Sequence, residues 1–321
     1  MSQTPHSHSA ASSFTLQRHA PDAEEAAQLV RAGLAHDGFE ALSEQFVKGL
    51  SQPELGHAHV LAHADGQLVG LAASDGETGE LVVAPDYRRR GVGTALAREL
   101  AGVPLWAHGD VPAAQVFARA LGLRPTRQLL VLALTAEKLG ERPGSAGSGE
   151  AIALPAGLEA VDLEESVRRW GRDWVLEQWL AVNNDAFSWH PEQGGWDLSR
   201  LEAGMASDWF EPGGVWFIWD ESRRKLAGFH WTKWHGADVP GGELTGEVYV
   251  IGLAGDYRGR HLGDPLLELG LSHLAGRGAE RVILYVESDN AAAVKAYERR
   301  GFVEAERHVV YAPASDPAAN S

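Results

Sequence analysis

"YRRRGVGTAL" (residues 87–96) and "YRGRHLGDPL" (residues 257–266) are two versions of one phrase in a chain of 321 residues. Each follows an apolar run and precedes a run with helical spacing, so each predicts a strand that turns into a helix. The likeness continues downstream, where Gly122 and Gly301 are each expected to end a short helix before a closing strand. The repetition predicts two copies of one α/β unit.

The stretch between the copies, residues 141–150, is rich in Gly, Ser and Pro, a composition typical of linkers. We therefore predict an N-terminal domain at residues 14–140 and a C-terminal domain at 151–313. Residues 1–13 and 314–321 are expected to be flexible tails.

The composition excludes several classes of function. Lys and Arg number 28 and Asp and Glu 44, so the net charge is 28 − 44 = −16, which disfavours broad binding to nucleic acid or anionic membranes. The chain has no Cys, which rules out disulfides and thiolate metal sites, and we expect no metal. Neither a spanning apolar run nor a signal-peptide core is evident, so we expect a cytoplasmic monomer that acts on a small molecule.

The repeated turn has the chemistry of an anion site. Gly91 and Gly93 can adopt backbone angles closed to other residues and let the main chain approach a ligand. Successive N–H groups at a helix start, with arginines beside them, favour a pyrophosphate. A plain Gly-rich corner with solvated arginines would look similar in one copy, but two matching copies favour ligand binding.

Two motifs connect these turns with a family. "RRRGVG" (residues 88–93) fits Arg-x-x-Gly-x-Gly, and "NAAAVKAYERRGF" (residues 290–302) has an Asn, a helix with Tyr and then Gly-Phe. Both resemble motifs of the GCN5-related N-acetyltransferases (GNAT). The resemblance covers both halves and implies two tandem GNAT-type α/β domains. Each would have a mixed, mostly antiparallel, splayed sheet flanked by helices, with acetyl-CoA as co-substrate.

The same resemblance implies which residues hold acetyl-CoA. In the first half these are Leu81, Val82, Val83, Arg89, Arg90, Gly91, Val92, Gly93 and Thr94. In the second half they are Ile251, Gly252, Leu253, Arg258, Gly259, Arg260, His261, Leu262, Gly263 and Asp264, followed by Asn290, Ala291, Ala292, Ala293, Val294 and Lys295.

The second loop departs from the motif. His261 stands where the first glycine is expected, and Asp264 places a carboxylate beside the anion site. Asp264 can instead cap the following helix, and the upstream Gly259 can supply some of the lost backbone freedom.

Acetyl transfer to an amine needs a base and an acid, because an α-amine with a pKa of about 7.7–8.0 is largely protonated at pH 7. In the second half Glu247 is the candidate base, expected at the sheet edge near the cofactor gap, and Tyr297 is the candidate acid. The plainer alternatives are a solvated strand-end charge and a core aromatic ring. Ala118 aligns with Tyr297, so the first half is expected to bind acetyl-CoA without catalysing transfer.

Four further segments resemble, in this order, the tandem acetyltransferases of mycothiol biosynthesis in actinobacteria: "NNDAFSWHPEQGGW" (183–196), "GFHWTKWH" (228–235), "GEVYVIGL" (246–253) and "YVESDN" (285–290). The resemblance implies acetylation of the cysteinyl amine of a cysteine–glucosamine–inositol conjugate, the last step of that pathway. By matching position it implies substrate contacts from Glu44, Glu192, Lys233, Glu247 and Tyr285.

Two other functions stay open at this point. The acidic chain also suits a polycationic amine, such as an aminoglycoside or a polyamine. A non-catalytic acetyl-CoA sensor is the other alternative, against which the presence of Glu247 and Tyr297 argues.

Overall fold

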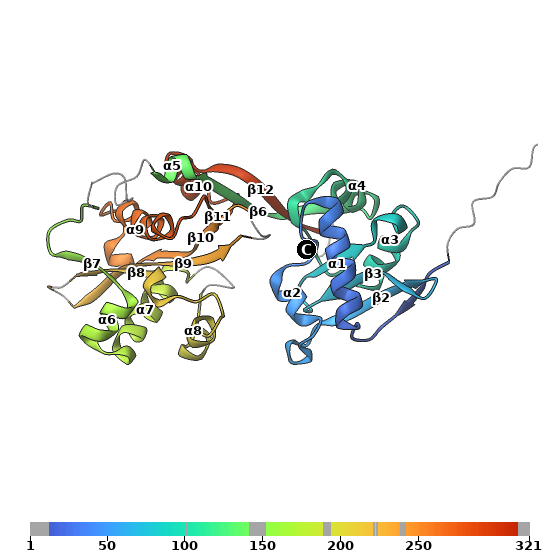
Figure 1. The fold of residues 1–321 in the computed structure, drawn as a ribbon, viewed down its shortest axis with the longest axis horizontal. Helices are drawn as coiled ribbons and strands as arrows, with labels where there is room; N and C mark the ends of the chain where they lie inside the picture. The colour runs from blue at the N-terminus through green and yellow to red at the C-terminus, as the bar shows by residue number, and fades with distance from the viewer. Residues whose placement is uncertain are drawn as a thin grey trace, which may run out of the picture. The chain divides into compact units, whose positions relative to one another are not determined.

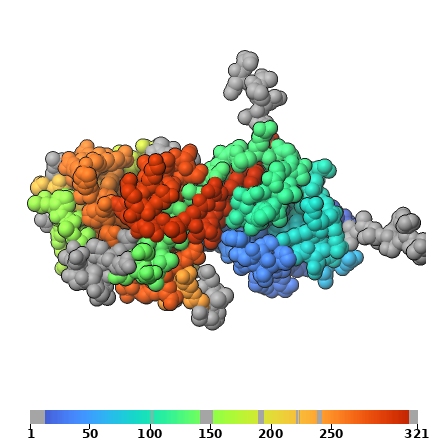
Figure 2. Space-filling model, turned by 90° about the horizontal axis from the view of Figure 1, so that it is seen from above, coloured from blue at the N-terminus to red at the C-terminus, as the bar shows by residue number. Residues whose placement is uncertain are grey.

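The computed structural model describes residues 13–100, 102–140, 152–188, 194–220, 222, 224–237 and 242–313 (Figures 1 and 2). Its internal contacts divide the chain into two compact units. The first unit is formed by residues up to Leu130, Glu287–Asp289 and the chain from Glu306 onward. The second unit is formed by Val131–Val286 and Asn290–Ala305.

The first unit has one sheet with helices on both faces (Figure 1). The strand order is β1 (Thr15–Gln17), β2 (Ala58–Ala64), β3 (Gln67–Ser74), β4 (Gly79–Val83), β5 (Leu105–Ala107) and the end of β12 (Val303–Pro313). Successive strand residues face opposite sides. Leu61 and Leu71 therefore pack with α1 (Ala23–Asp37) and α2 (Glu44–Gly49), whereas Val60 and Val69 pack with α3 (Val92–Glu99). The remaining helical elements are α4 (Pro112–Ala120), η1 (Pro53–Leu55), η2 (Pro85–Tyr87) and η3 (His108–Asp110).

The second unit repeats this plan. Its strand order is the end of β6 (Leu123–Thr135), β11 (Arg281–Glu287), β10 (Thr245–Leu253), β9 (Lys225–Gly236), β8 (Val215–Asp220) and β7 (Leu158–Asp162). One face packs an aromatic core, including Trp179 and Trp231, under α6 (Leu163–Trp170), α7 (Arg172–Ala186) and α8 (Leu198–Met205). The other face packs against α9 (Gly263–Gly276). The shorter elements are α5 (Ala136–Gly140), α10 (Ala291–Glu298), η4 (Pro212–Gly214) and η5 (Gly255–Tyr257).

Each sheet is mixed and splayed, as predicted. Most neighbouring strands run antiparallel, but β10 and β11 run parallel and pair only from Thr245 to Val248 on the β10 side. In the first unit, β4 and β5 are also parallel and pair only at Gly79 and Leu105. Beyond these points the strands part, so both units contain the gap that the resemblance to the GNAT family implies.

The two closing strands do not follow the division predicted at residues 141–150. The end of β12 pairs with β5, with Val309 opposite Ala107, and so belongs to the first unit. In Figure 2 this red end of the chain is seen against green residues of the first unit, where Thr126 donates a hydrogen bond to the Val310 carbonyl (3.2 Å). The end of β6 belongs to the second unit. The predicted linker lies outside the described residues, as do the predicted tails apart from Ser13.

Among the described residues, no helix is long and apolar enough to cross a membrane. The same part of the chain contains no group of three or more His, Cys, Asp or Glu side chains that could hold a metal ion.

Candidate active site

The repeated arginines anchor each loop to its own unit. Arg88 donates from Nε to the Val83 carbonyl (3.0 Å) and forms a bidentate ion pair with Asp37 at the end of α1 (2.7 Å for each contact). This hydrogen-bonded pair lowers the pKa of Asp37 below its usual value. Arg258 repeats the arrangement, donating to the carbonyls of Leu253 (3.3 Å) and Asp185 (2.9 Å). Both arginines therefore fix a strand end to a helix end.

The two loops have the same backbone shape with the glycines in different places. Residues 89 and 259 are equivalent and both lie in the left-handed region, with φ 62° at Arg89 and 73° at Gly259. Residues 91 and 261 also match, with φ 86° at Gly91 and 59° at His261. Each loop thus has one glycine and one strained residue at these positions. His261 has not changed the loop's path, and Gly259 supplies the conformational freedom that is missing at residue 261.

The side chains around the second loop also have partners. Arg90 lies over the Tyr87 ring at 5.1 Å, and Arg260 repeats this contact with Tyr257 at 4.9 Å. Asp264, the carboxylate beside the predicted anion site, forms an ion pair with Arg300. Its charge is therefore offset within the second unit.

Three predicted substrate residues lie on one face of three adjacent strands. Lys233 of β9 is directly opposite Glu247 of β10, which is opposite Ile283 of β11. Tyr285 lies two residues beyond Ile283, so it shares this face, and 46% of its surface is exposed. Glu247 and Tyr285 flank the point where β10 and β11 part.

Two irregularities in the ladder bracket Glu247. The register of β9 and β10 shifts between Val248 and Val250, which leaves Tyr249 as the extra residue of a bulge. A second shift leaves His235 unpaired between Trp234, opposite Gly246, and Gly236, opposite Thr245. Bulges redirect side chains and are common beside active sites.

Glu247 is a buried carboxylate with a histidine partner. It is 5% exposed, and its Oε2 lies 2.7 Å from Nε2 of His235. The sequence predicted Glu247 at the sheet edge; this was wrong, because β10 lies between β9 and β11 in the interior of the sheet. The side of β10 that borders the gap is unpaired because β11 diverges from it after Val248, and not because β10 is an edge strand.

Lys233 is held on aromatic rings. Its Nζ lies 4.9 Å from the ring centre of Trp209 and 6.0 Å from that of Tyr249. These cation–π contacts hold the ammonium group on the face of the sheet that carries Glu247. The arrangement offers an apolar wall and two opposite charges to a polar ligand.

Tyr297 and Asn290 lie on the helix after β11. Asn290 caps α10, where its side chain accepts a hydrogen bond from the Ala293 N–H (3.2 Å). The Tyr297 ring packs edge-on against Phe302 at 5.7 Å. Burial raises the pKa of Tyr297 to about 12, so its hydroxyl keeps its proton at neutral pH.

Comparison with known proteins places this geometry in a family. The model of the acetyltransferase (GNAT) family matches residues 176–302, and that of a GNAT domain matches residues 56–123. The chain is 49% identical to the mycothiol acetyltransferase of Corynebacterium aurimucosum over 296 residues, which covers 90% of this chain and 94% of that protein. It is 44% identical to the mycothiol acetyltransferase of Corynebacterium glutamicum, with coverage of 90% and 93%. The chain belongs to the mycothiol acetyltransferase family.

Solved structures agree on the fold. A tandem GNAT protein from the clavulanic acid biosynthesis pathway has a TM-score of 0.67 at 18% identity, covering 95% of this chain and all (100%) of that one. A GCN5-related N-acetyltransferase from Sphaerobacter thermophilus has a TM-score of 0.64 at 21% identity, with coverage of 92% and 94%. These structures confirm the predicted tandem GNAT fold, and the mycothiol acetyltransferase relatives confirm the predicted acyltransferase activity.

The first unit of this acetyltransferase is built differently where the second has Tyr297. Ala118 is 3% exposed and packs with Val309 and Tyr311 of β12. Nearby, buried Glu80 lies 3.0 Å from His108 and accepts a hydrogen bond from the Ser43 N–H (2.6 Å). This network was not predicted from the sequence, because its members come from distant elements.

Some predicted residues lie elsewhere or outside the described part of the chain. Glu44 begins α2 and forms an exposed ion pair with Lys48 at 2.7 Å. Glu192 lies outside the described residues. Residues 81–83 end β4 and 251–253 end β10, each along the stretch beyond the parallel pairing.

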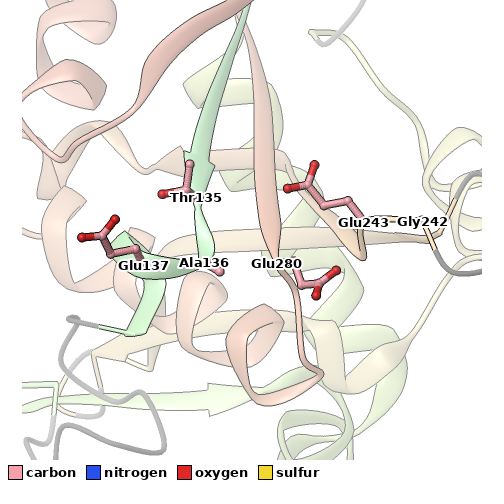
Figure 3. A pocket seen from close by; sticks show the side chains of 6 residues that line it. All are labelled: Thr135, Ala136, Glu137, Gly242, Glu243 and Glu280. Carbon is pink, nitrogen blue, oxygen red and sulfur yellow. The ribbon is translucent and has the colours of Figure 1, made fainter.

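A separate cavity of about 550 Å³ in the second unit is lined by Thr135, Ala136, Glu137, Gly242, Glu243 and Glu280. Figure 3 shows the three carboxylates on segments at the ends of different strands. Such a lining repels phosphate groups, so this cavity does not suit the acetyl-CoA pyrophosphate.

Proposed function

We propose that the second unit transfers the acetyl group of acetyl-CoA to the cysteinyl amine of the cysteine–glucosamine–inositol conjugate that precedes mycothiol. The observation that carries this proposal is the joint placement of Lys233, Glu247 and Tyr285 at the point where β10 and β11 part. Family membership supplies the substrate class, since the relatives are named mycothiol acetyltransferases.

Glu247 acts as the base in this proposal. The substrate ammonium must lose a proton before its nitrogen can attack, because an α-amine has a pKa of about 7.7–8.0. Glu247 accepts that proton, directly or through a water. The side chain suits the role because it is buried, hydrogen-bonded to His235 and on the same face of the sheet as Tyr285.

Tyr297 acts as the acid. When the carbon–sulfur bond breaks, the departing CoA thiolate takes the hydroxyl proton of Tyr297. The raised pKa of this tyrosine, about 12, keeps the proton available at neutral pH. A positioned acid contributes to the transition state and leaves substrate binding unchanged.

Acetyl-CoA is held by the repeated elements. The residues that would hold it in the second unit are the end of β10 (Ile251, Gly252, Leu253), the loop and helix start at residues 258–264, and the start of α10 at 290–295. The main-chain groups of β10 that face the gap are available to the pantetheine arm, because the parallel pairing stops at Val248. In the first unit, residues 81–83 and 89–94 would hold a second molecule without chemistry.

The test is direct transfer with competing amines. The protein is incubated with acetyl-CoA and, separately, with the conjugate, spermidine and an aminoglycoside, and the site of acetylation is read by mass fragmentation. The proposal predicts N-acetylation of the cysteinyl residue at a kcat/KM far above that for the other amines. Equal or faster transfer to spermidine or the aminoglycoside would overturn the substrate assignment, and failure to acetylate any amine would favour a sensor.

A further inference from the structure

Glu247 is enclosed by its surroundings. Only 7% of its side chain is exposed, compared with 27% for that of His235. A base of this kind must give up the proton it has taken before the next turnover. His235 is hydrogen-bonded directly to the carboxylate and is the more exposed member of the pair.

The His235 contact depends on an irregular strand. Because His235 is the extra residue between the pairs Trp234–Gly246 and Gly236–Thr245, its ring reaches Glu247 from outside the regular ladder. The contact is short, with 2.7 Å between Nε2 and Oε2. A regular strand would have no extra residue here. The consequence of the bulge is therefore the contact between His235 and the base Glu247.

The charged groups around the pair come from each strand of this face. Lys233 lies opposite Glu247 on β9, with its Nζ on the rings of Trp209 and Tyr249. Arg281 on β11 is in register with Thr245, one pair beyond Gly246. Arg277 is the C-cap residue of α9 on the other face, where it lies over the Trp234 ring at 4.4 Å and forms an ion pair with Glu211. Lys233 and Arg281 therefore lie on the face of the sheet that carries Glu247.

We propose that His235 is the exit for the substrate proton: it takes from Glu247 the proton that Glu247 took from the amine, and passes it to water. The O–H bond of the protonated Glu247 breaks as an Nε2–H bond forms, which gives an imidazolium. The Nδ1–H proton then leaves to solvent, which leaves the Nε2–H tautomer of His235. Exchange with water, in which Nδ1 gains one proton and Nε2 loses one, restores the Nδ1–H tautomer before the next turnover. His235 acts through Glu247 and is therefore a positioning residue.

This inference rests on the proposed function, since it needs Glu247 as the base. The wild-type protein must first acetylate the conjugate, and the two ideas fail differently. Without wild-type transfer the proposed function fails. If the wild-type protein does acetylate the conjugate, the results for the His235 variants alone decide the present proposal.

The experiment compares His235→Ala and His235→Gln with the matched control His36→Gln, an exposed histidine on α1. Glutamine can still donate a hydrogen bond to Glu247 but cannot relay a proton. We measure kcat and the KM values for the conjugate and for acetyl-CoA over a series of imidazole concentrations, together with the solvent deuterium effect on kcat. Circular dichroism and acetyl-CoA binding show whether each variant is folded.

We expect kcat of both His235 variants to fall by about 10- to 100-fold, within the lower range of positioned proton transfer. The KM for acetyl-CoA should not change, and added imidazole should raise kcat of the alanine variant in proportion to its concentration. The solvent deuterium effect should grow in both variants, and the control should match wild type.

Two results would overturn the proposal. One is wild-type kcat in His235→Gln, because the hydrogen bond alone would then suffice. The other is a folded His235→Ala whose kcat is low and does not respond to imidazole. If the alanine variant fails to fold, the kcat and deuterium effect of the glutamine variant decide the question.

Discussion

Tyr311, from the last strand of the chain, packs against Ala118 in the first unit and donates its hydroxyl hydrogen bond to Asp110 at 2.7 Å. Ala118 is the position that aligns with Tyr297 of the second unit. The tyrosine from β12 thus lies beside the place where a catalytic tyrosine would stand. Burial, and the hydrogen bond to Asp110, raise the pKa of Tyr311 to about 12.

The close packing at Ala118 makes the first unit intolerant of a larger residue there. Ala118→Tyr should lower the free energy of unfolding of this unit by about 1–3 kcal/mol, the usual cost of overpacking a filled core. The matched control is Ala120→Tyr, at an exposed position on the same helix. Urea unfolding measures both variants, and equal stability of the two would show that Tyr311 does not fill this space.

The reciprocal placement of glycine predicts opposite effects in the second loop. Gly259→Val forces a branched residue into a left-handed conformation, which costs about 1–2 kcal/mol of strain energy. If the loop relieves this strain only when acetyl-CoA is not bound, the affinity for acetyl-CoA falls about tenfold. His261→Gly removes strain and should keep or improve acetyl-CoA binding. Calorimetric titration should show one class of site weakened in Gly259→Val and none in His261→Gly. Weakened acetyl-CoA binding in His261→Gly together with unchanged binding in Gly259→Val would refute this explanation of the loop.

A buried histidine in the second unit predicts acid sensitivity. His230 is fully buried and its Nδ1 donates to the Leu266 carbonyl (3.0 Å). Burial lowers its pKa to about 4, whereas the unfolded chain has an ordinary histidine near 6.5. The folded state therefore binds fewer protons between these values, so its stability is full above pH 6.5 and falls as the pH drops toward 4.

The expected slope is up to about 1.4 kcal/mol per pH unit from this one group. His230→Leu should flatten the dependence of the unfolding free energy on pH by that amount, whereas His36→Leu should not. Tryptophan fluorescence is a suitable probe, since of the 11 Trp only Trp106 precedes residue 131. An unchanged slope in His230→Leu would show that this histidine is not buried in its neutral form.

Sequence predicted the parts of this molecule that repeat or alternate. The phrases at residues 87 and 257 fixed two strand–loop–helix units, and the resemblance named Glu247, Lys233 and Tyr285, which the register of β9, β10 and β11 places on one face. His235 was not predicted because it reaches Glu247 through a bulge. A bulge of one residue cannot be recognised from the alternation of polar and apolar residues along a strand.

The exchange of the closing strands was missed for another reason. The apolar alternation of residues 303–313 predicts a strand but does not say which sheet receives it. The left-handed conformation of His261 was also not predicted, because histidine is enriched at positive φ among non-glycine residues but too weakly to mark a single position. Glycine at 259 was the only sequence sign that the loop retains its shape.

Tyr297 separates catalysis from binding in the second unit. Tyr297→Phe keeps the ring that packs on Phe302 but removes the hydroxyl. We expect kcat to fall by roughly 10- to 100-fold, at the low end of acid–base effects, and kcat/KM to fall equally. Because the pKa of Tyr297 is about 12, its ionisation should not limit the rate below about pH 10, and the alkaline limb should be the same in wild type and variant. A raised KM for the amine at unchanged kcat would make the hydroxyl a binding group.

The most direct measurement is the steady-state rate of acetyl transfer to the cysteine–glucosamine–inositol conjugate by Glu247→Gln and wild type. The substitution keeps the size of the buried side chain and its contact with His235 but removes the base. We predict that kcat falls by about 10²- to 10⁴-fold, while the stoichiometry of bound acetyl-CoA stays at the wild-type value. A glutamine variant that turns over at nearly the wild-type rate would contradict the assignment of Glu247 as the base.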